Sequence, residues 1–270
     1  MNSTLNHIKD FHQWSRLPNS YYDIGIFANV VPYNDGYIGA VRLGNASAND
    51  QVGIVNYDND LNLLNCTQIT AGEDPRTFIF NNIPYALTWY GYYASGQWVM
   101  RYKLINLQTR AVLNLIIEDV PLSPLSVLGK NWMPLVKNGA LYIVVSIDPD
   151  INVLYCDTTT GYCIWITSNF TGNIPVTLNR GGTPFIWHNK LQKYIGLGHK
   201  SYDSSNHRPF PYTITKDFTK VYIGEDVITG NFGVEDPQSI FMQDNKLYCC
   251  IGNWHVPNEG SVGLYEIIID

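Results

Sequence analysis

The feature of this sequence that most limits its fold is a hairpin pattern that recurs five times along 270 residues. Each copy has a polar start, a proline within a few residues, an apolar run, a turn with asparagine and a second run of aliphatic residues or tyrosine. The copies start near Asn29, Asp74, Asn131, Gly182 and Asp236, roughly fifty residues apart. Asparagine and glycine tolerate the positive φ that tight hairpin turns need. The pattern therefore predicts five similar β units.

A second, weaker hairpin follows each copy except the last, so each unit is predicted to be a four-stranded antiparallel sheet. Such units at a period near fifty are typical of propeller blades around a central channel. The last unit is one strand short, and we expect residues 1–28 to supply that strand and close the ring. The prediction is an all-β fold, with residues 1–270 forming a single five-bladed β-propeller domain. A two-sheet sandwich is the competing architecture, but it would not require five similar hairpins at even spacing.

Composition limits the partners and the compartment. A net charge of −6 with only 17 Lys and Arg argues against a protein that coats nucleic acid. The sequence has no apolar run long enough to span a membrane and no signal-peptide pattern at its start, so we expect a cytoplasmic protein. The five cysteines lack metal-ligand spacing and have no histidine near them in a zinc pattern. We therefore expect reduced, buried thiols, no metal site and no cofactor.

Propeller geometry gathers a polar set of residues at one mouth of the channel. The first strand of each blade lines the channel, and an antiparallel hairpin brings the start of its first strand and the end of its second to the same edge. The basic residues at these places are Arg42, Arg76, Lys130, Arg180 and His199. The other polar and aromatic ones include Asn29, Glu73, Asp74, Trp89, Asn131, Trp132, Asp148, Asp236 and Trp254.

So many cations around a channel need partners, because desolvating a lone charge is costly. Either the neighbouring carboxylates or an anionic ligand can serve, and guanidinium and ammonium groups suit phosphate oxygens. Individual residues also have purely structural interpretations. Asp74 before Pro75 is also a turn-and-cap pattern with Arg76 as its ion-pair partner, and His199 fits a hydrogen-bonded core imidazole. The segment Glu235-Asp236-Pro237 repeats Glu73-Asp74-Pro75, so part of this motif belongs to the repeating unit.

The motifs resemble those of a known family. Glu73-Asp74-Pro75-Arg76 is similar to the Glu-Asp-Pro-Arg signature of the five-bladed propeller β-mannoside phosphorylases and the related β-mannosyltransferases. Further segments resemble that family in the same order over about residues 24–255: Lys130-Asn131-Trp132, Arg180-Gly181-Gly182-Thr183-Pro184 and Gly198-His199. The chain departs from the family at Asn29-Val30-Val31, where Asn-Pro-Ser is usual, and at Gly129, where a glutamate commonly stands.

The resemblance implies an inverting enzyme that makes or breaks a glycosidic bond, most of all a β-mannosyl bond, with Asp74 as the single catalytic acid. It implies that phosphate or a sugar phosphate binds to the five basic residues, and we assign the remaining mouth residues to the sugar. Two alternatives remain. One is a hydrolase of the five-bladed propeller type that uses Asp74, Asp148 and Glu235 or Asp236 as carboxylates. The other is a non-catalytic sugar-binding propeller, which predicts near-identical pockets in each blade.

Overall fold

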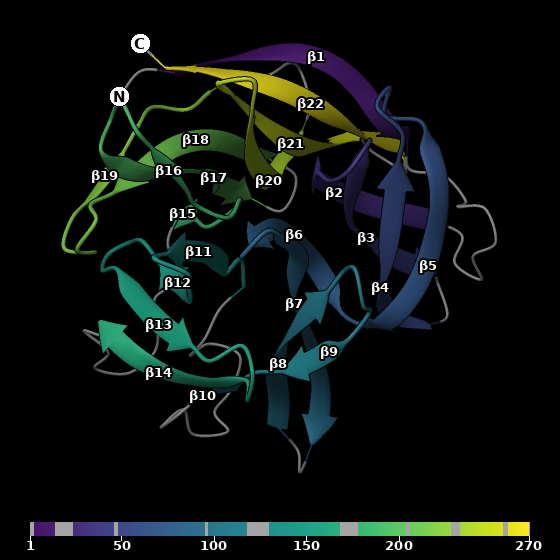
Figure 1. Cartoon of the computed structure of the whole chain (residues 1–270), viewed down its shortest axis with the longest axis horizontal. Helices are drawn as coiled ribbons and strands as arrows, with labels where there is room; N and C mark the ends of the chain where they lie inside the picture. Colours follow the sequence, from purple (N-terminus) through teal and green to yellow (C-terminus); the bar gives the residue numbers. More distant parts are fainter. Residues whose placement is uncertain are drawn as a thin grey trace.

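The computed structural model describes residues 3–13, 24–45, 48–94, 97–117, 130–167, 178–203, 206–227, 233–255 and 259–269. Every regular element in these ranges is a β-strand, so the all-β prediction is confirmed. The described ranges contain no helix with the length and apolar character needed to cross a membrane. The strands form sheets that are arranged around a common centre (Figure 1).

The first two sheets follow the predicted pattern of four consecutive antiparallel strands. The first sheet consists of β2 (Ile24–Pro32), β3 (Tyr37–Asn45), β4 (Ala48–Tyr57) and β5 (Leu63–Ala71). The second consists of β6 (Glu73–Phe80), β7 (Ile83–Ala94), β8 (Gln97–Asn106) and β9 (Val112–Asn114). In each sheet the first strand is an edge strand.

The third sheet has five strands because a short strand that follows the second sheet joins it. Its members are β10 (Ile116–Ile117), β11 (Met133–Lys137), β12 (Ala140–Ser146), β13 (Asn152–Cys156) and β14 (Tyr162–Thr167). The strand β10 pairs in parallel with β14, whereas the other neighbours are antiparallel.

The last two hairpin groups share one nine-stranded sheet. One group consists of β15 (Asn179–Arg180), β16 (Ile186–His188), β17 (Lys193–Asp203), β18 (Asn206–Ile214) and β19 (Val221–Ile223). The other consists of β20 (Val234–Gln243), β21 (Lys246–His255), β22 (Glu259–Ile269) and β1 (Ser3–Gln13). A single parallel register pair, His207 with Val234, joins β18 to β20. The structure therefore differs from five separate four-stranded sheets here and at β10.

Tight turns at the predicted asparagines connect three of the inner hairpins. Both central residues have positive φ at Asn81-Asn82, Asn138-Gly139 and Asp244-Asn245. This is the backbone of a type I′ turn, whose twist matches that of the flanking strands. The hairpin from β16 to β17 differs, because its turn spans residues 189–192 and its residue of positive φ is Gln192.

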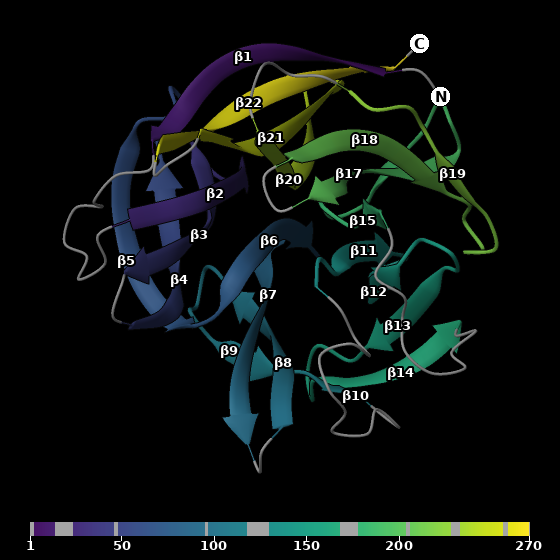
Figure 2. The ribbon, with the colours of Figure 1, turned by 180° about the vertical axis from the view of Figure 1, so that it is seen from behind.

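The hydrophobic core is divided among the spaces between successive sheets. Phe78 of the second sheet packs in one cluster with Ile143 of the third, and Leu135 of the third packs with Tyr212 on β18. The cluster of the first sheet contains Leu264 of β22 as well as residues of the second sheet. The first sheet therefore packs on both sides, against β6–β9 and against β20–β22, as the view from behind also shows (Figure 2).

The inner strands also meet around a cavity of about 370 Å³. The strands β2, β6, β11, β16 and β20 all contribute to its wall, and the lining side chains are apolar. They include Val31, Phe78, Val136, Trp187 and Phe241. This apolar end lies toward the hairpin turns, so the polar residues predicted for a channel mouth belong to the opposite end, where the inner strands begin.

The cysteine expectation is wrong for two of the five residues. Cys156 on β13 and Cys163 on β14 are register partners, and they form a disulfide. Cys66, Cys249 and Cys250 are free thiols, of which the last two are buried. Their spacing in the sequence did not indicate a disulfide. The two cysteines meet only because a short turn pairs β13 with β14.

Lowering the pH is expected to destabilise the fold through His12 on β1. This imidazole is 4% exposed, and its ring nitrogens contact the Gly25 carbonyl at 3.1 Å and the Tyr57 hydroxyl at 2.8 Å. Burial lowers the pKa of His12 from 6.5 to about 4 despite the hydrogen bond to Gly25. The stability from neutral His12 is therefore present above pH 6.5 and is lost as the pH falls toward 4, with about 2 kcal/mol lost at pH 5. Urea unfolding of the wild type and His12→Gln at pH 7 and 5 measures this difference.

His7→Gln is the matched control, because His7 lies on the same strand with an exposed side chain. It should leave the wild-type pH dependence unchanged. An identical loss of stability between pH 7 and 5 in His12→Gln and the wild type would contradict the assignment to His12.

Candidate functional site

Irregularities at the start of the inner strands aim side chains toward the polar end. The register shifts between Ile26 and Asn29 in β2 and between Glu73 and Arg76 in β6. Asp74 within the second irregularity has a φ of 45°, and Asn131 just before β11 has a φ of 65°. Bulges of this kind redirect side chains, and Asp and Asn tolerate the left-handed region better than most residues. Asp74 and Asn131 therefore suit the local backbone, and their short polar side chains also suit a polar site.

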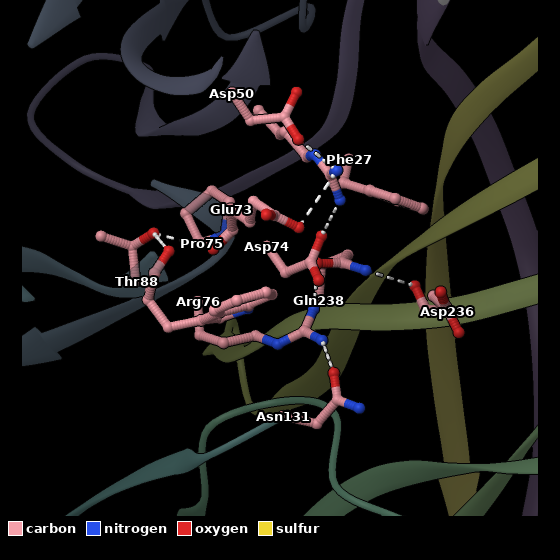
Figure 3. Close-up of polar contacts among 12 residues, drawn as sticks. Phe27, Asp50, Glu73, Asp74, Pro75, Arg76, Thr88, Asn131, Asp236 and Gln238 are labelled. Atoms are coloured by element: carbon pink, nitrogen blue, oxygen red, sulfur yellow. Dashed lines mark hydrogen bonds and ion pairs between the residues drawn. The ribbon is translucent and has the colours of Figure 1, made fainter. Parts of the chain in front are cut away.

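Arg42 on β3 contacts a cluster of three carboxylates, those of Asp50, Glu73 and Asp74. These three acidic residues are labelled in Figure 3. Arg42 Nη1 is 2.8 Å from Asp74 Oδ1, and its Nη2 is 3.1 Å from Glu73 Oε2. The same Nη2 also contacts Asp50 Oδ2 from β4. Burial opposes the charge of this guanidinium, but the three carboxylates outweigh burial and raise the pKa of Arg42. Arg42 is thus a fixed cation whose charge is already balanced by protein groups.

Glu73 has the environment of a proton-holding carboxyl. Burial raises its pKa, and the charges of Asp74 and Asp50 add to that effect. Arg42 and Lys130 oppose the shift without cancelling it. A carboxyl group with a raised pKa is suited to general-acid chemistry near neutral pH. We had assigned Glu73 only to sugar binding, and its proton affinity could not be inferred without the burial and the neighbouring carboxylates.

Arg76 on β6 is a buried cation held by neutral acceptors. Its Nη2 donates to Asn131 Oδ1 at 3.0 Å, and its Nη1 donates to the Pro237 carbonyl at 3.3 Å and to Gln238 Oε1. Burial lowers the pKa of Arg76, while the charges of Asp74 and Asp236 oppose that shift. Arg76 is thus influenced by the charges of both Asp74 and Asp236.

A second polar cluster surrounds Asp236 on β20. Its Oδ1 is 2.9 Å from His207 Nδ1 and 3.7 Å from His199 Nδ1. Burial disfavours the Asp236 carboxylate, but the charges of His199, His207 and Arg76 and the His207 hydrogen bond outweigh it and lower the pKa to about 2. The two imidazoles are stacked, with ring centroids 4.9 Å apart. Their side chains and Asp236 bring possible metal-ligand atoms within 4.8 Å of one another.

His199 itself is a buried, neutral imidazole. Burial is the largest cause that lowers its pKa to about 4, and the charges of His207, Arg76 and Arg180 lower it further. Asp236 opposes the shift. The sequence predicts that His199 adds a positive charge to a phosphate site. A neutral imidazole can offer phosphate a hydrogen bond but no charge.

The five basic residues predicted for phosphate are linked through shared neighbours. Arg42 and Lys130 both act on Glu73, and Arg76 and His199 both act on Asp236. Arg180 on β15 is the register partner of His199 and acts on it through its charge. The set thus extends from the first sheet to β17, and each member has a neighbour in one of the two clusters.

The tryptophans are less available than the sequence predicts. Trp89 is 4% exposed, and the Lys130 ammonium lies 4.3 Å from the centroid of its ring. Trp132 is 2% exposed and stacks on Tyr102 with centroids 3.5 Å apart. Trp254 is 38% exposed. Of these three rings, the structure leaves only Trp254 with a substantially open surface.

Two other residues assigned to the sugar have structural contacts. The Asn29 amide is fully buried, and it donates to the carbonyls of Phe27, Ala40 and Pro75 while its oxygen accepts from the Thr77 N–H. It therefore fastens β2 and β3 to β6, and we leave it out of the proposed site.

Asp148, the other of these two residues, accepts a hydrogen bond from Asn179 Nδ2 at 2.9 Å and lies between β12 and β15. Its contact joins the third sheet to the strand that carries Arg180. Through Asn179, Asp148 can help to hold β15, and with it Arg180, in place.

Three site residues were missed by sequence reasoning: Asp50, His207 and Gln238. Asp50 stands on β4 and His207 on β18, the strands that pair with those of Arg42 and His199, and only the register shows their proximity. A signal did exist for Gln238, because it follows Asp236 by two positions as Arg76 follows Asp74. The two repeated motifs meet directly, since Arg76 donates to Gln238.

No protein-family model and no curated protein sequence matches this chain. Among solved structures, a β-1,2-mannobiose phosphorylase from Listeria innocua has a TM-score of 0.64 at 11% identity, over 98% of this chain and 96% of that one. The catalytic domain of a GH62 α-L-arabinofuranosidase from Coprinopsis cinerea has a TM-score of 0.67 at 9% identity, with the same coverage. A GH43 β-1,3-galactosidase has a TM-score of 0.62 at 9% identity, over 97% and 96%.

These likenesses show the fold. The chain has an all-β fold similar to the folds of these three proteins. At about one-tenth identity, activity and substrate do not transfer with the fold.

Proposed function

We propose that residues 1–270 form a single five-bladed propeller enzyme that makes or breaks a glycosidic bond at the polar end of its channel. The observation that carries this proposal is the pair Glu73 and Asp74, which lies on a bulge at the start of an inner strand and faces Arg42. A carboxyl of raised pKa next to an ion-paired carboxylate supplies the proton handling that glycosidic oxygen chemistry requires.

In this proposal Asp74 is the catalytic acid, and the reaction inverts the anomeric centre. Glu73 binds the sugar next to it and keeps a proton available in the same cluster. Phosphate or a sugar phosphate binds among Arg76, Lys130 and Arg180, where fork-shaped and ammonium donors suit its oxygens. The motif resemblance favours a β-mannosyl substrate.

A hydrolase is the second candidate, and the charge balance around Arg42 favours it. Three carboxylates neutralise Arg42, so it has less capacity for phosphate than a free guanidinium. The charges of two further carboxylates, Asp74 and Asp236, act on Arg76. Inverting hydrolysis uses two carboxylates, one to protonate the leaving oxygen and one to activate water. Several of the similar solved structures are glycoside hydrolases.

An activity screen with and without phosphate separates these candidates. The purified full chain is incubated with sugar 1-phosphates or nucleotide sugars and simple sugar acceptors, and released phosphate or nucleotide is measured. β-Mannosides are tested in parallel in phosphate-containing and phosphate-free buffer. We expect phosphate release or phosphate-dependent cleavage. Equal cleavage in both buffers assigns a hydrolase, and binding of sugars without any turnover contradicts the proposal of an enzyme.

A further inference from the structure

His199, His207 and Asp236 come from three different strands and converge on one point. His199 lies on β17, and His207 lies on its antiparallel neighbour β18. Both are near the end of the hairpin at which β17 leads into β18. Asp236 lies on β20, which meets β18 at the register pair of His207 with Val234. This junction between the last two strand groups therefore places two imidazoles beside one carboxylate.

The separations match a small coordination sphere. His207 Nδ1 and His199 Nδ1 lie 2.9 and 3.7 Å from the same oxygen, Asp236 Oδ1. A tetrahedral ion with bonds of about 2.0–2.1 Å holds its ligand atoms about 3.3 Å apart. The two distances lie on either side of that value, and the ligand atoms of all three side chains lie within 4.8 Å of one another, so modest side-chain rotations would bring them onto one ion.

The contacts of His199 point to a ligand that the protein alone does not supply. Its side chain is buried, and Nδ1 has no hydrogen-bond partner among the described residues. At 3.7 Å, Asp236 Oδ1 is too far away for a hydrogen bond. A buried nitrogen without a partner is costly, whereas an ion between His199 and Asp236 would satisfy both groups.

The outer nitrogen of His207 is held as a metal ligand usually is. Its Nε2 lies 3.0 Å from Ser201 Oγ, while Nδ1 faces Asp236. Metal-binding imidazoles commonly use their second nitrogen in such a contact, which fixes the orientation of the ring. Ser201 would therefore position His207 without binding the ion.

We propose that His199, His207 and Asp236 form a binding site for a divalent transition metal, with Zn²⁺ as the ion that this ligand set fits best. Imidazole nitrogens suit zinc and similar metals, whereas Ca²⁺ and Mg²⁺ prefer sites made of oxygens. Three protein ligands leave a fourth position open. The nearby charges of Arg76 and Arg180 favour an anion or hydroxide there. The proposal does not depend on the reaction proposed above.

The test uses Co²⁺ and Zn²⁺ with the purified full chain after removal of metals by chelation. Addition of Co²⁺ should give intense visible absorption of a four- or five-coordinate ion at one equivalent, and Zn²⁺ should displace it. A spectrum equal to that of aqueous Co²⁺ overturns the proposal. A strong near-ultraviolet sulfur-to-cobalt band also overturns it, because that band would assign the ion to free cysteines.

Matched variants locate the ion. His199→Gln and His207→Gln, with folding checked by circular dichroism, should abolish the visible band. Ser201→Ala should retain the band with about 10–100-fold weaker binding, as expected for a positioning residue. His7→Ala is the control, because His7 and Asp10 form an exposed His–Asp pair at 3.1 Å elsewhere on the protein. Unchanged binding in the folded His199→Gln and His207→Gln variants would overturn the site. The measurement needs no substrate, so its failure is distinct from failure of the proposed reaction.

Discussion

Asp74→Asn is expected to lower turnover by about 10²–10⁴-fold, the usual loss for a general acid. The amide keeps the shape of the side chain, and its oxygen can still accept from Arg42 Nη1, which lies 2.8 Å from Asp74 Oδ1. The substitution removes the ionisable proton and one of the three carboxylates around Arg42. We therefore expect the protein to remain folded while kcat falls by this factor. Steady-state kinetics with the substrate found in the activity screen, together with urea unfolding, measure both effects.

Asp50→Asn distinguishes the loss of an acid from a change in charge around Arg42. Asp50 contacts the same guanidinium but stands on β4, outside the Glu73-Asp74 motif. If Asp74 is the acid, Asp50→Asn should cost far less turnover than Asp74→Asn. Equal losses would show that the loss of a negative charge next to Arg42 causes the effect. Near-full turnover of Asp74→Asn with an inactive Asp236→Asn would transfer the acid to β20 and favour the hydrolase.

Asn29→Ala is expected to destabilise the protein by about 2–5 kcal/mol. The side chain makes four contacts with buried backbone, and its removal leaves the Thr77 N–H and the Pro75 carbonyl without this partner. Each buried polar group left unsatisfied costs about 1–3 kcal/mol. The total is a large part of the stability of an ordinary domain, which is about 5–15 kcal/mol. The midpoint of urea unfolding measures the change.

Asn56→Ala is the control for this measurement. Asn56 also lies on the first sheet, but its amide donates to Asn65 Oδ1 in an exposed contact. A surface substitution of this kind is expected to change stability by less than about 0.5 kcal/mol. A similar small change in Asn29→Ala would mean that the amide does not fasten the first sheet to the second.

The sequence predicted the hairpins well because their determinants are local. Asn81-Asn82 and Asn138-Gly139 adopt the positive φ expected at tight turns. It did not predict the junction at His207 and Val234 or the addition of β10 to the third sheet. These pairings depend on how neighbouring sheets meet, and no short stretch of sequence carries that information.

The site was predictable as a gathering of residue types but not as a set of contacts. Arg42 and Asp74 form an ion pair, and the charge of Asp74 acts on Arg76. The aromatic interpretation was less successful, because Trp132 stacks on Tyr102 inside the core. An aromatic residue just before a strand can point to either side of the sheet, and the positive φ of Asn131 next to Trp132 could not be inferred from the sequence.

The antiparallel pairing of β1 with β22 has a consequence for how the chain folds. The register runs from Ser3 with Ile269 to Gln13 with Ser261, so it joins segments from opposite ends of the described chain. Closing so large a loop has an entropic cost that comes before its contacts form, and folds rich in such contacts fold slowly. During synthesis β1 emerges long before β22 and has no partner strand until β22 is made. The pairing edge of β1 therefore stays open until β22 is available.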